Sequence, residues 1–454
     1  MTLENKTYSV IIISLIISII FSIIFIKKYD SYEISTDETE NHRMIKSDIP
    51  SIWTNGEIIK RDLMSGKNYF ESGTEIHRSY LPPRLIALYS HMFNYDLFEN
   101  WEKKIISSEN KKIYYLILQT FFYYVILIFF FKKIQTKYNL KTCFFIICFL
   151  SLEPSIFFFH SSFHTESIYF SLQILMLTLL FDDSLKKIRF AIIGLLLGLM
   201  YLQKVVTILL IIPIIFYYIF KFKKKSLLPL LIIVFFYTFI LITVGFGNYK
   251  RAGIFYISPP GNKTVLHIYF PEEILSKAKK ISKSDAYKIK KNDEKKWLDE
   301  NDINLNSEID RMKHYNYLQN YTFKIFLKYP VITFKHIIWK TLQTGILNPI
   351  YIFEFFEYEN AKKPYYYLKD DYKKINLPLR ILYSLALYGI VLFGFFSSKK
   401  DIRFDHYILL TLSSIYMLGM LGWAGNSRYF VPILIYLSIF FGHGLSRITE
   451  KIKI

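Results

Sequence analysis

The chain has 454 residues, of which 52% are hydrophobic and 19% are aromatic, and its formal net charge is +20. This apolar content exceeds the roughly 45–50% of an average soluble chain, and it also excludes an intrinsically disordered protein. Two cysteines, Cys143 and Cys148, are too few for a disulfide scaffold. The composition therefore indicates an integral membrane protein that is unusually basic.

About ten stretches are apolar enough to cross a membrane as helices of about 20 residues. They are Thr7–Ile26, Ile113–Phe131, Thr142–Phe159, Glu166–Phe181, Phe190–Gln203, Val205–Phe220, Ser226–Phe246, Leu377–Phe396, Tyr407–Ala424 and Tyr429–Leu445. The region from Phe190 to Phe220 is too long for one upright helix, so we expect a tight hairpin that turns near Lys204. The pattern predicts an all-α polytopic membrane protein.

The charged residues in the short loops predict the orientation of these spans. With the hairpin in place, the loops on one side and the C-terminal tail carry 17 Lys or Arg, and the short turns on the other side carry only Lys204 and Arg428. Lys and Arg accumulate on the cytoplasmic side, so we expect both termini in the cytoplasm. The Lys-, Ile- and Asn-rich composition is typical of AT-rich bacterial genomes and favours a bacterial cytoplasmic (inner) membrane. Much of the positive charge is therefore an orientation signal, and we expect no nucleic-acid partner.

Five regions follow from this arrangement. They are the first transmembrane helix (1–26), a first outer loop (27–112), transmembrane helices two to seven (113–246), a second outer loop (247–376), and the last three spans with a cytoplasmic tail (377–454). Three outer segments have helical periodicity with one polar face and are expected to lie along the membrane surface, namely Ile52–Ser65, Leu81–Asn94 and Tyr317–Leu347, the last broken at Pro330 and Gly345. The charged run Lys277–Glu300 is expected to be a solvated helix or mobile loop.

Ionisable residues within spans or their tight turns are costly, which makes them candidates for function. On the outer side these are His160, His164, Glu166, Lys204 and Arg428. A carboxylate can accept a proton from a hydroxyl, and Lys and Arg can bind a phosphate. The simpler interpretation of the two cations is that they extend to the membrane interface.

A metal site is a further alternative at one outer turn. His160, His164 and Glu166 are residue types that bind zinc or manganese. The same residues also suit helix capping and hydrogen bonding within the turn, which is the interpretation we favour. We therefore assign no certain cofactor and keep a divalent metal ion as an alternative.

Several short motifs follow one another in an order that is typical of one family. They are Thr36-Asp37-Glu38, Ser47-Asp48, Ser65-Gly66, Ser79-Tyr80-Leu81-Pro82-Pro83-Arg84, Leu152-Glu153-Pro154, His164-Thr165-Glu166, the glycine-rich Gly194–Leu199 before Lys204, and Ser427-Arg428-Tyr429-Phe430-Val431-Pro432. In these motifs and in the order of its spans, the chain resembles the GT-C class of polyprenyl-phosphate-sugar-dependent glycosyltransferases, especially relatives of protein O-mannosyltransferases and aminoarabinose transferases. The resemblance covers the spans and the first outer loop, about two thirds of the chain.

The resemblance implies an inverting transfer from a polyprenyl-phosphate-linked sugar to a hydroxyl on the outer face of the membrane. Asp48 is the first candidate for the general base, and Asp37, supported by Glu38, is the second. Asp48 also suits an N-cap before Pro50, and Asp37 with Glu38 also suits a solvated loop. The acceptor is left open as a lipid, a glycan or a protein, because the second outer loop matches no assignable pattern.

The remaining site residues implied by the resemblance would bind the donor. Lys204 and Arg428 would stabilise its phosphate, Arg84 and Arg78 are reserve cations, and Tyr80, Glu166 and His164 would shape the sugar or acceptor pocket. Two alternatives are a lipid-linked saccharide transporter or flippase, and an O-antigen ligase or polymerase. We find no internal pseudo-symmetry of the kind that transporters show, and the acidic first loop favours a donor with a single phosphate.

Overall fold

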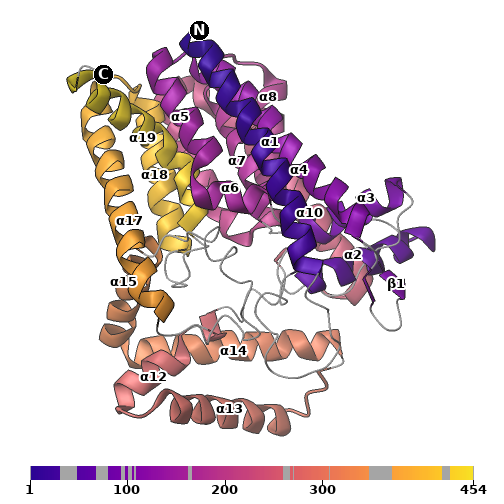
Figure 1. The fold of residues 1–454 in the computed structure, drawn as a ribbon. Helices are drawn as coiled ribbons and strands as arrows, with labels where there is room; N and C mark the ends of the chain where they lie inside the picture. Colours follow the sequence, from indigo (N-terminus) through magenta and orange to yellow (C-terminus); the bar gives the residue numbers. More distant parts are fainter. Residues whose placement is uncertain are drawn as a thin grey trace.

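The structure, a computed structural model, describes residues 2–30, 49–67, 80–93, 98–100, 105–106, 109–161, 166–258, 266–268, 270–305, 307–346, 371–421 and 430–452. Every predicted span overlaps a helix of the bundle in Figure 1. These helices are α1 (Leu3–Asp30), α4 (Glu109–Ile134), α5 (Leu140–Leu152) with α6 (Pro154–His160), α7 (Glu166–Leu180), α8 (Lys187–Gln203), α9 (Ile211–Phe222), α10 (Leu227–Ala252), α17 (Asp371–Ser397), α18 (Phe404–Leu421) and α19 (Val431–Lys451). Short 3-10 turns are η2 (Val205–Leu209), η3 (Lys223–Ser226) and η5 (Ser398–Lys400). The protein is thus an all-α polytopic membrane protein.

Length and hydropathy together identify fewer certain spans than the predicted ten. Among the described residues, five helical stretches are long and apolar enough to cross a membrane, or six if the bent pair α5–α6 counts as one span. One of the five runs for 48 residues from Val205 to Ala252. A straight helix of that length would measure about 72 Å, whereas the hydrocarbon core is roughly 30 Å thick. This stretch therefore needs a reversal, and the total number of spans stays a prediction.

The predicted hairpin is visible in the packing of α8 against α10. A Cβ atom on Gly194 would lie 2.5 Å from the Ile233 carbonyl oxygen, and one on Gly198 would lie 2.7 Å from Ile240 Cβ. The later residue of α8 contacts the later residue of α10, so the two helices run parallel. Because they are parallel, α9 must return the chain between them, and the reversal before α9 lies next to Lys204.

Two aspartates join the loops at one end of the bundle. Asp182 and Asp183 follow α7, and they form ion pairs with Lys133, Lys137, Arg189, Lys221 and Arg403. We call these seven residues the charge cluster. The cations come from the α4–α5, α7–α8, α9–α10 and α17–α18 connections, which are the loops that the charge pattern places on one side. The structure therefore confirms that these loops share one end of the bundle.

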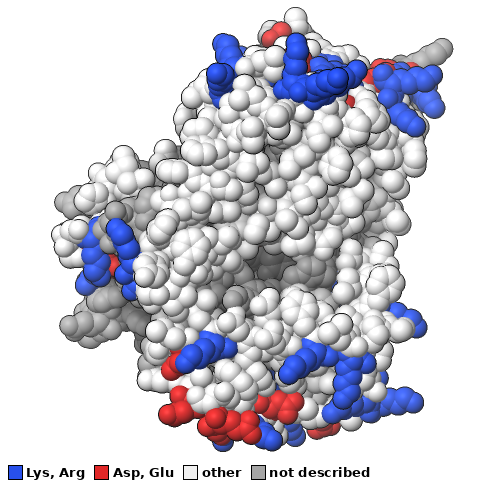
Figure 2. Space-filling model, turned by 180° about the vertical axis from the view of Figure 1, so that it is seen from behind, with Lys and Arg blue, Asp and Glu red and all other residues white. Residues whose placement is uncertain are grey.

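Both described chain ends lie at this same end. The ring of Tyr8 in α1 packs 5.2 Å from that of Phe131 at the end of α4, and an Arg447 guanidinium nitrogen lies 2.7 Å from Asp401 Oδ2 in the α17–α18 connection. Figure 1 shows both termini together at the top of the bundle. On the face drawn in Figure 2, charged residues gather mainly at the two ends, with a broad uncharged band between them. Such a band suits the hydrocarbon core of a membrane.

The third predicted span, Thr142–Phe159, is bent rather than continuous. α5 and α6 meet at an angle of 56°. Pro154 begins α6 and lacks the N–H group that would continue the hydrogen bonds of α5. The Glu153 carboxylate caps the new helix by accepting a hydrogen bond of 2.7 Å from the Ile156 backbone N–H.

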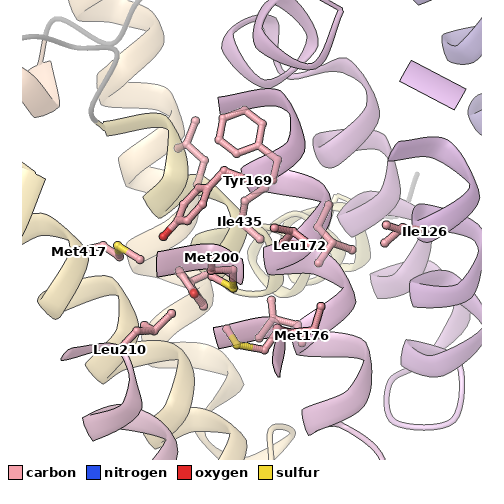
Figure 3. Packing of buried hydrophobic residues seen from close by; sticks show 14 of the residues in the cluster. Ile126, Tyr169, Leu172, Met176, Met200, Leu210, Met417 and Ile435 are labelled. Carbon is pink, nitrogen blue, oxygen red and sulfur yellow. The ribbon is translucent and has the colours of Figure 1, made fainter. Parts of the chain in front are cut away.

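The core of the bundle is mainly aliphatic and aromatic, with some buried serine, glutamine and histidine side chains among them. Tightly packed side chains from α4, α7, α8, α18 and α19 and from the start of α9 meet in its centre, as Figure 3 shows for Ile126, Tyr169, Leu172, Met176, Met200, Leu210, Met417 and Ile435. Burial of these side chains removes apolar surface from the lipid and positions the helix ends that carry the polar residues.

The two outer loops contain the predicted amphipathic helices. The first holds α2 (Ile49–Met64), α3 (Leu81–Met92) and a short antiparallel pair of strands, β1 (Phe98–Asn100) and β2 (Ile105–Ile106). The second holds α12 (Pro271–Lys279), α13 (Lys283–Glu300), α14 (Glu308–Lys328) and α15 (Pro330–Ile346). The predicted break at Pro330 is confirmed, and the charged run after Lys277 is largely the helix α13. α12 to α15 have a small core of their own, formed by Phe270, Ile274, Leu275, Ala286 and Ile325.

Candidate functional site

A buried ion pair lies at the end of the bundle opposite the charge cluster. Lys204 follows the last residue of α8, and Glu166 is the first residue of α7. The Lys204 Nζ atom lies 2.7 Å from Glu166 Oε1, and the two side chains are only 9% and 0% exposed. A carboxylate at a helix N-terminus is favoured by the helix dipole. The expected proximity of the outer turns is therefore confirmed for these two residues.

The surroundings of Lys204 are aromatic and hydroxylic. Its Nζ atom lies 5.8 Å from the centre of the Tyr169 ring, close enough for a cation–π interaction. The Tyr169 hydroxyl and the Thr207 hydroxyl are 3.0 Å apart and share a hydrogen bond. These contacts hold the polar turn between α8 and η2 in one conformation.

Tyr80 connects the first outer loop to this turn. Its backbone N–H donates a hydrogen bond of 2.9 Å to the carbonyl of Leu202, two residues before Lys204. Its hydroxyl accepts a hydrogen bond of 2.8 Å from the Asn248 side-chain amide at the end of α10. The same amide nitrogen also donates to the Tyr256 carbonyl at 2.6 Å. Tyr80 therefore ties the start of α3 to the ends of both α8 and α10.

Two arginines flank this tyrosine. Arg84 is buried one turn into α3; its Nη1 atom donates a hydrogen bond of 3.1 Å to the Tyr80 carbonyl, and its guanidinium carbon lies 5.5 Å from the centre of the Tyr80 ring. Arg251, near the end of α10, donates a hydrogen bond to the Tyr256 hydroxyl. Burial raises the pKa of the Tyr80 phenol above its usual value, although the Asn248 hydrogen bond and the two arginines act in the opposite direction. Tyr80 is thus a neutral phenol beside two permanent cations.

The structure brings together Tyr80, Arg84, Glu166 and Lys204 from the predicted set. The other predicted site residues lie outside the described residues; they are Asp37, Glu38, Asp48, Arg78, His164 and Arg428. Their roles as base, phosphate ligand or pocket residue stay predictions.

His160 occupies a structural position within the bundle. Its ring stacks on that of Tyr123 with the centres 4.3 Å apart, and its Nδ1 atom is 3.1 Å from the Ser161 hydroxyl. In the part of the chain that the structure describes, no group of three His, Cys, Asp or Glu side chains is arranged to hold a metal ion. The divalent metal ion stays an untested alternative, since His164 lies outside that part.

Several polar residues of the site were not identified from the sequence. Asn248 and Arg251 lie in the last turns of α10, and Tyr256 follows it. Two further buried charges that were not identified are Glu57 and Lys60 of α2, both 3% exposed. The sequence does contain a signal for Asn248 and Arg251, because polar residues that directly follow a long apolar run, such as that of α10, mark the end of a span. Two charged residues buried on a short amphipathic helix give no such signal, because their burial depends on the packing of α2 against α3.

The comparisons with known proteins give one family match. Residues 70–251 match the family model of the Alg9-like mannosyltransferase family, a GT-C-type family of membrane glycosyltransferases. No curated protein and no solved structure shows a significant match. The matched segment contains all four of the assembled site residues and the helices that carry them.

Proposed function

We propose that this chain, a membrane glycosyltransferase of the GT-C type, transfers a sugar from a polyprenyl phosphate to an acceptor hydroxyl at the outer face of a bacterial cytoplasmic membrane. The observation that carries the proposal is the buried Lys204–Glu166 pair at the end of the bundle opposite the charge cluster, in a turn to which the Tyr80 backbone is bonded two residues before Lys204. A cationic and hydroxylic site at a membrane boundary suits a lipid-linked phosphate donor. The family model supports mannose as the first sugar to test.

The reaction needs one base and forms no covalent intermediate on the enzyme. Asp48, or Asp37 assisted by Glu38, accepts the proton of the acceptor hydroxyl while its oxygen attacks the anomeric carbon. The bond from that carbon to the phosphate oxygen breaks, and the polyprenyl phosphate leaves with the electron pair. A single displacement of this kind inverts the anomeric configuration.

The leaving phosphate gains negative charge, which cations at the site stabilise. Lys204 acts as a point charge whose direction is fixed by Glu166, and Arg428 would add a second positive charge through its guanidinium. Arg84 and Arg78 are reserve cations. A pre-oriented cation contributes more than a mobile one, because it needs no reorganisation as the charge develops. Tyr80, Glu166 and His164 shape the pocket for the sugar or acceptor.

The test uses the full-length protein in lipid nanodiscs with radiolabelled polyprenyl-phosphate mannose, and then with other sugars. Membrane lipids, glycans and proteins from the source cell serve as acceptors. We expect donor consumption, an inverted product anomer by NMR, and a loss of 10²-fold or more in Asp48→Asn if it is the base. If only Asp37→Asn loses activity, the base is Asp37.

Nucleotide-linked sugars provide the control for the donor class. Consumption of GDP-mannose with no use of polyprenyl-phosphate sugars would overturn the lipid-linked donor. For the phosphate role, Lys204→Met is expected to weaken donor binding about tenfold, as the loss of a charge-assisted contact worth about 1.5 kcal/mol does. Unchanged donor affinity in a folded Lys204→Met protein would overturn that role.

A further inference from the structure

The helix α15 in the second outer loop presents an apolar face to its surroundings. Val331, Phe334, Ile338, Trp339 and Leu342 are all exposed, with 64% of Phe334 and 62% of Trp339 accessible. Their spacing of three, four, one and three residues places them along one side of the helix. Leu327, one turn before the break at Pro330, extends the same surface and is 82% exposed. A contiguous apolar surface of this kind marks an interaction site.

The side of α15 that faces the protein mixes polar and apolar residues, because Ile332 and Ile337 pack against the small core of the outer helices beside two buried polar side chains. Thr333 and His336 are 6% and 2% exposed. The His336 ring packs 5.5 Å from the ring of Phe270 and its Nδ1 atom lies 3.3 Å from Lys277 Nζ. An exposed face this rich in large apolar side chains is not expected for a helix on a water-exposed surface. It is the arrangement expected where apolar side chains face hydrocarbon.

The neighbouring helix α13 serves as an internal comparison. Its exposed side carries Lys and acidic residues, including Lys288 and Asp285, whose side chains are 71% and 56% exposed. Its buried side contributes Ala286 to the small core shared with α12 and α14. Two helices of one outer region thus face two different environments, water for α13 and an apolar phase for α15.

The position of α15 identifies this apolar phase. α15 contacts both α17 and α18 of the bundle, and Figure 1 shows it beside the lower end of α17. On α17, Leu379, Leu382 and Leu385 are exposed. The exposed leucines of a membrane-spanning helix contact lipid, so the apolar face of α15 continues a surface that already lies in the bilayer.

We propose that the exposed face of α15 is embedded in the bilayer leaflet next to the outer loops and anchors the second outer loop to the membrane. Trp339 is a residue type enriched at membrane interfaces. Lys335, an exposed residue among these side chains, can extend its ammonium toward the headgroups from its aliphatic stem. The occupant of the face is therefore the lipid bilayer itself, and α13 stays in water.

Spin labels test this placement in the full-length protein in nanodiscs. A parent with Cys143→Ala and Cys148→Ala receives one label at a time, at Phe334→Cys, Ile338→Cys or, as the water-facing control, Lys288→Cys. Power saturation compares relaxation by oxygen, which concentrates in lipid, with relaxation by a water-soluble nickel chelate. We expect oxygen to dominate at Phe334 and Ile338, and nickel at Lys288, in variants that melt at the temperature of the parent.

Two results would overturn the proposal. Dominant relaxation by nickel at Phe334 and Ile338 would place the face in water. Protection from both reagents, with dipolar broadening that disappears on dilution with unlabelled protein, would show that a second copy covers it. If the labelled variants do not fold, brominated lipids provide a second measurement with native side chains. They should quench wild-type fluorescence more than that of Trp339→Phe, and equal quenching would contradict the embedded face.

Discussion

The ammonium of Lys204 and the carboxylate of Glu166 lie 2.7 Å apart, with both side chains buried between the ends of α7 and α8. We expect Lys204→Met to lower the free energy of unfolding by about 3–5 kcal/mol, because it leaves a buried carboxylate without its partner. The double variant Lys204→Met with Glu166→Gln should regain most of that stability while sugar transfer stays impaired. Thermal melting and transfer assays on the same preparations measure both quantities.

The ion pair between Lys283 and Glu273 is the matched control for this experiment. Its lysine side chain is 67% exposed, so Lys283→Met should cost no more than about 1 kcal/mol. Equal losses of stability at Lys204 and Lys283 would contradict a special role of burial. Full transfer activity in the double variant would show that the pair is purely structural.

The hydroxyl of Tyr80 links the first outer loop to α10 through Asn248. Tyr80→Phe removes this hydrogen bond and should cost about 1 kcal/mol of stability, together with a lower rate of sugar transfer. Burial is the main reason that the pKa of Tyr80 lies above its usual value, so the phenol is protonated at every pH below 10. The ratio of wild-type to Tyr80→Phe activity should therefore stay constant from pH 6 to pH 9, and an inflection within that range would contradict a neutral phenol.

Asp183 forms ion pairs with Lys137, Lys221 and Arg403, which come from three different connections between helices. Burial alone would raise its pKa, but hydrogen bonds from Lys137 and Lys221 outweigh this effect and hold the pKa of Asp183 well below its usual value. A lowered pKa means that the carboxylate stabilises the folded state at neutral pH, and that this contribution is lost as the pH falls below about 4. Asp183→Asn should therefore melt at a lower temperature than wild type at pH 7, and the difference should shrink in acid.

The exposed pair of Glu300 and Lys296, whose charged atoms are 3.8 Å apart, is the control for that measurement. Glu300→Gln should leave the melting temperature within error of wild type at both pH values. A difference between wild type and Asp183→Asn that is independent of pH would point to lost packing and not to charge.

The parallel contact of α8 and α10 depends on a missing side chain at Gly194. An added methyl group would lie 2.5 Å from the Ile233 carbonyl oxygen, so one backbone must move. We expect Gly194→Ala to destabilise the protein by roughly 1–3 kcal/mol. Gly389→Ala in α17, where no atom lies within 4 Å of the new methyl, should be neutral or slightly stabilising, because alanine is the better helix former. Melting curves of the two variants in one detergent provide the comparison.

The orientation of the bundle can be tested with single cysteines in intact cells. A cysteine at Lys224, an exposed residue in η3 next to Ser226, should resist an impermeant maleimide added from outside. A cysteine at Lys288 of α13 should react, because α13 belongs to the second outer loop. The opposite pattern would reverse the proposed orientation and place both termini outside the cytoplasm.

The positions of the apolar helices could be predicted from the sequence because the hydropathy signal is long and local, whereas the number that cross the membrane stays a prediction. Even the hairpin at Lys204 followed from the length of one apolar run and the distribution of Lys and Arg. The bend between α5 and α6 was not predicted, although Glu153-Pro154 marks it, because an apolar run on both sides conceals a change in direction.

The candidate site was predicted only in part, for a physical reason. Glu166 and Lys204 are charged residues in apolar surroundings, which makes them conspicuous. Asn248 and Tyr256 become part of the site only because α10 packs along α8, which brings the end of α10 to Tyr80. The hydrogen bond between Asn248 and Tyr80 joins residues that are 168 positions apart in the sequence. For α15 the sequence predicted an amphipathic segment along the membrane surface, but not which side of the helix packs against α12 and α17.

The charge cluster also implies an order of events during synthesis. Lys137 precedes Asp183 in the chain, so the aspartate has a cationic partner as soon as α7 leaves the ribosome. Arg403 is 220 residues further on, and translation at about 5–20 residues per second delivers it about 11–44 s later. Lys221 arrives between the two. The helices up to α10 can therefore bring Asp182 and Asp183 together with four of their five cations long before α17 and α18 are made, and the last helices join a partly assembled protein.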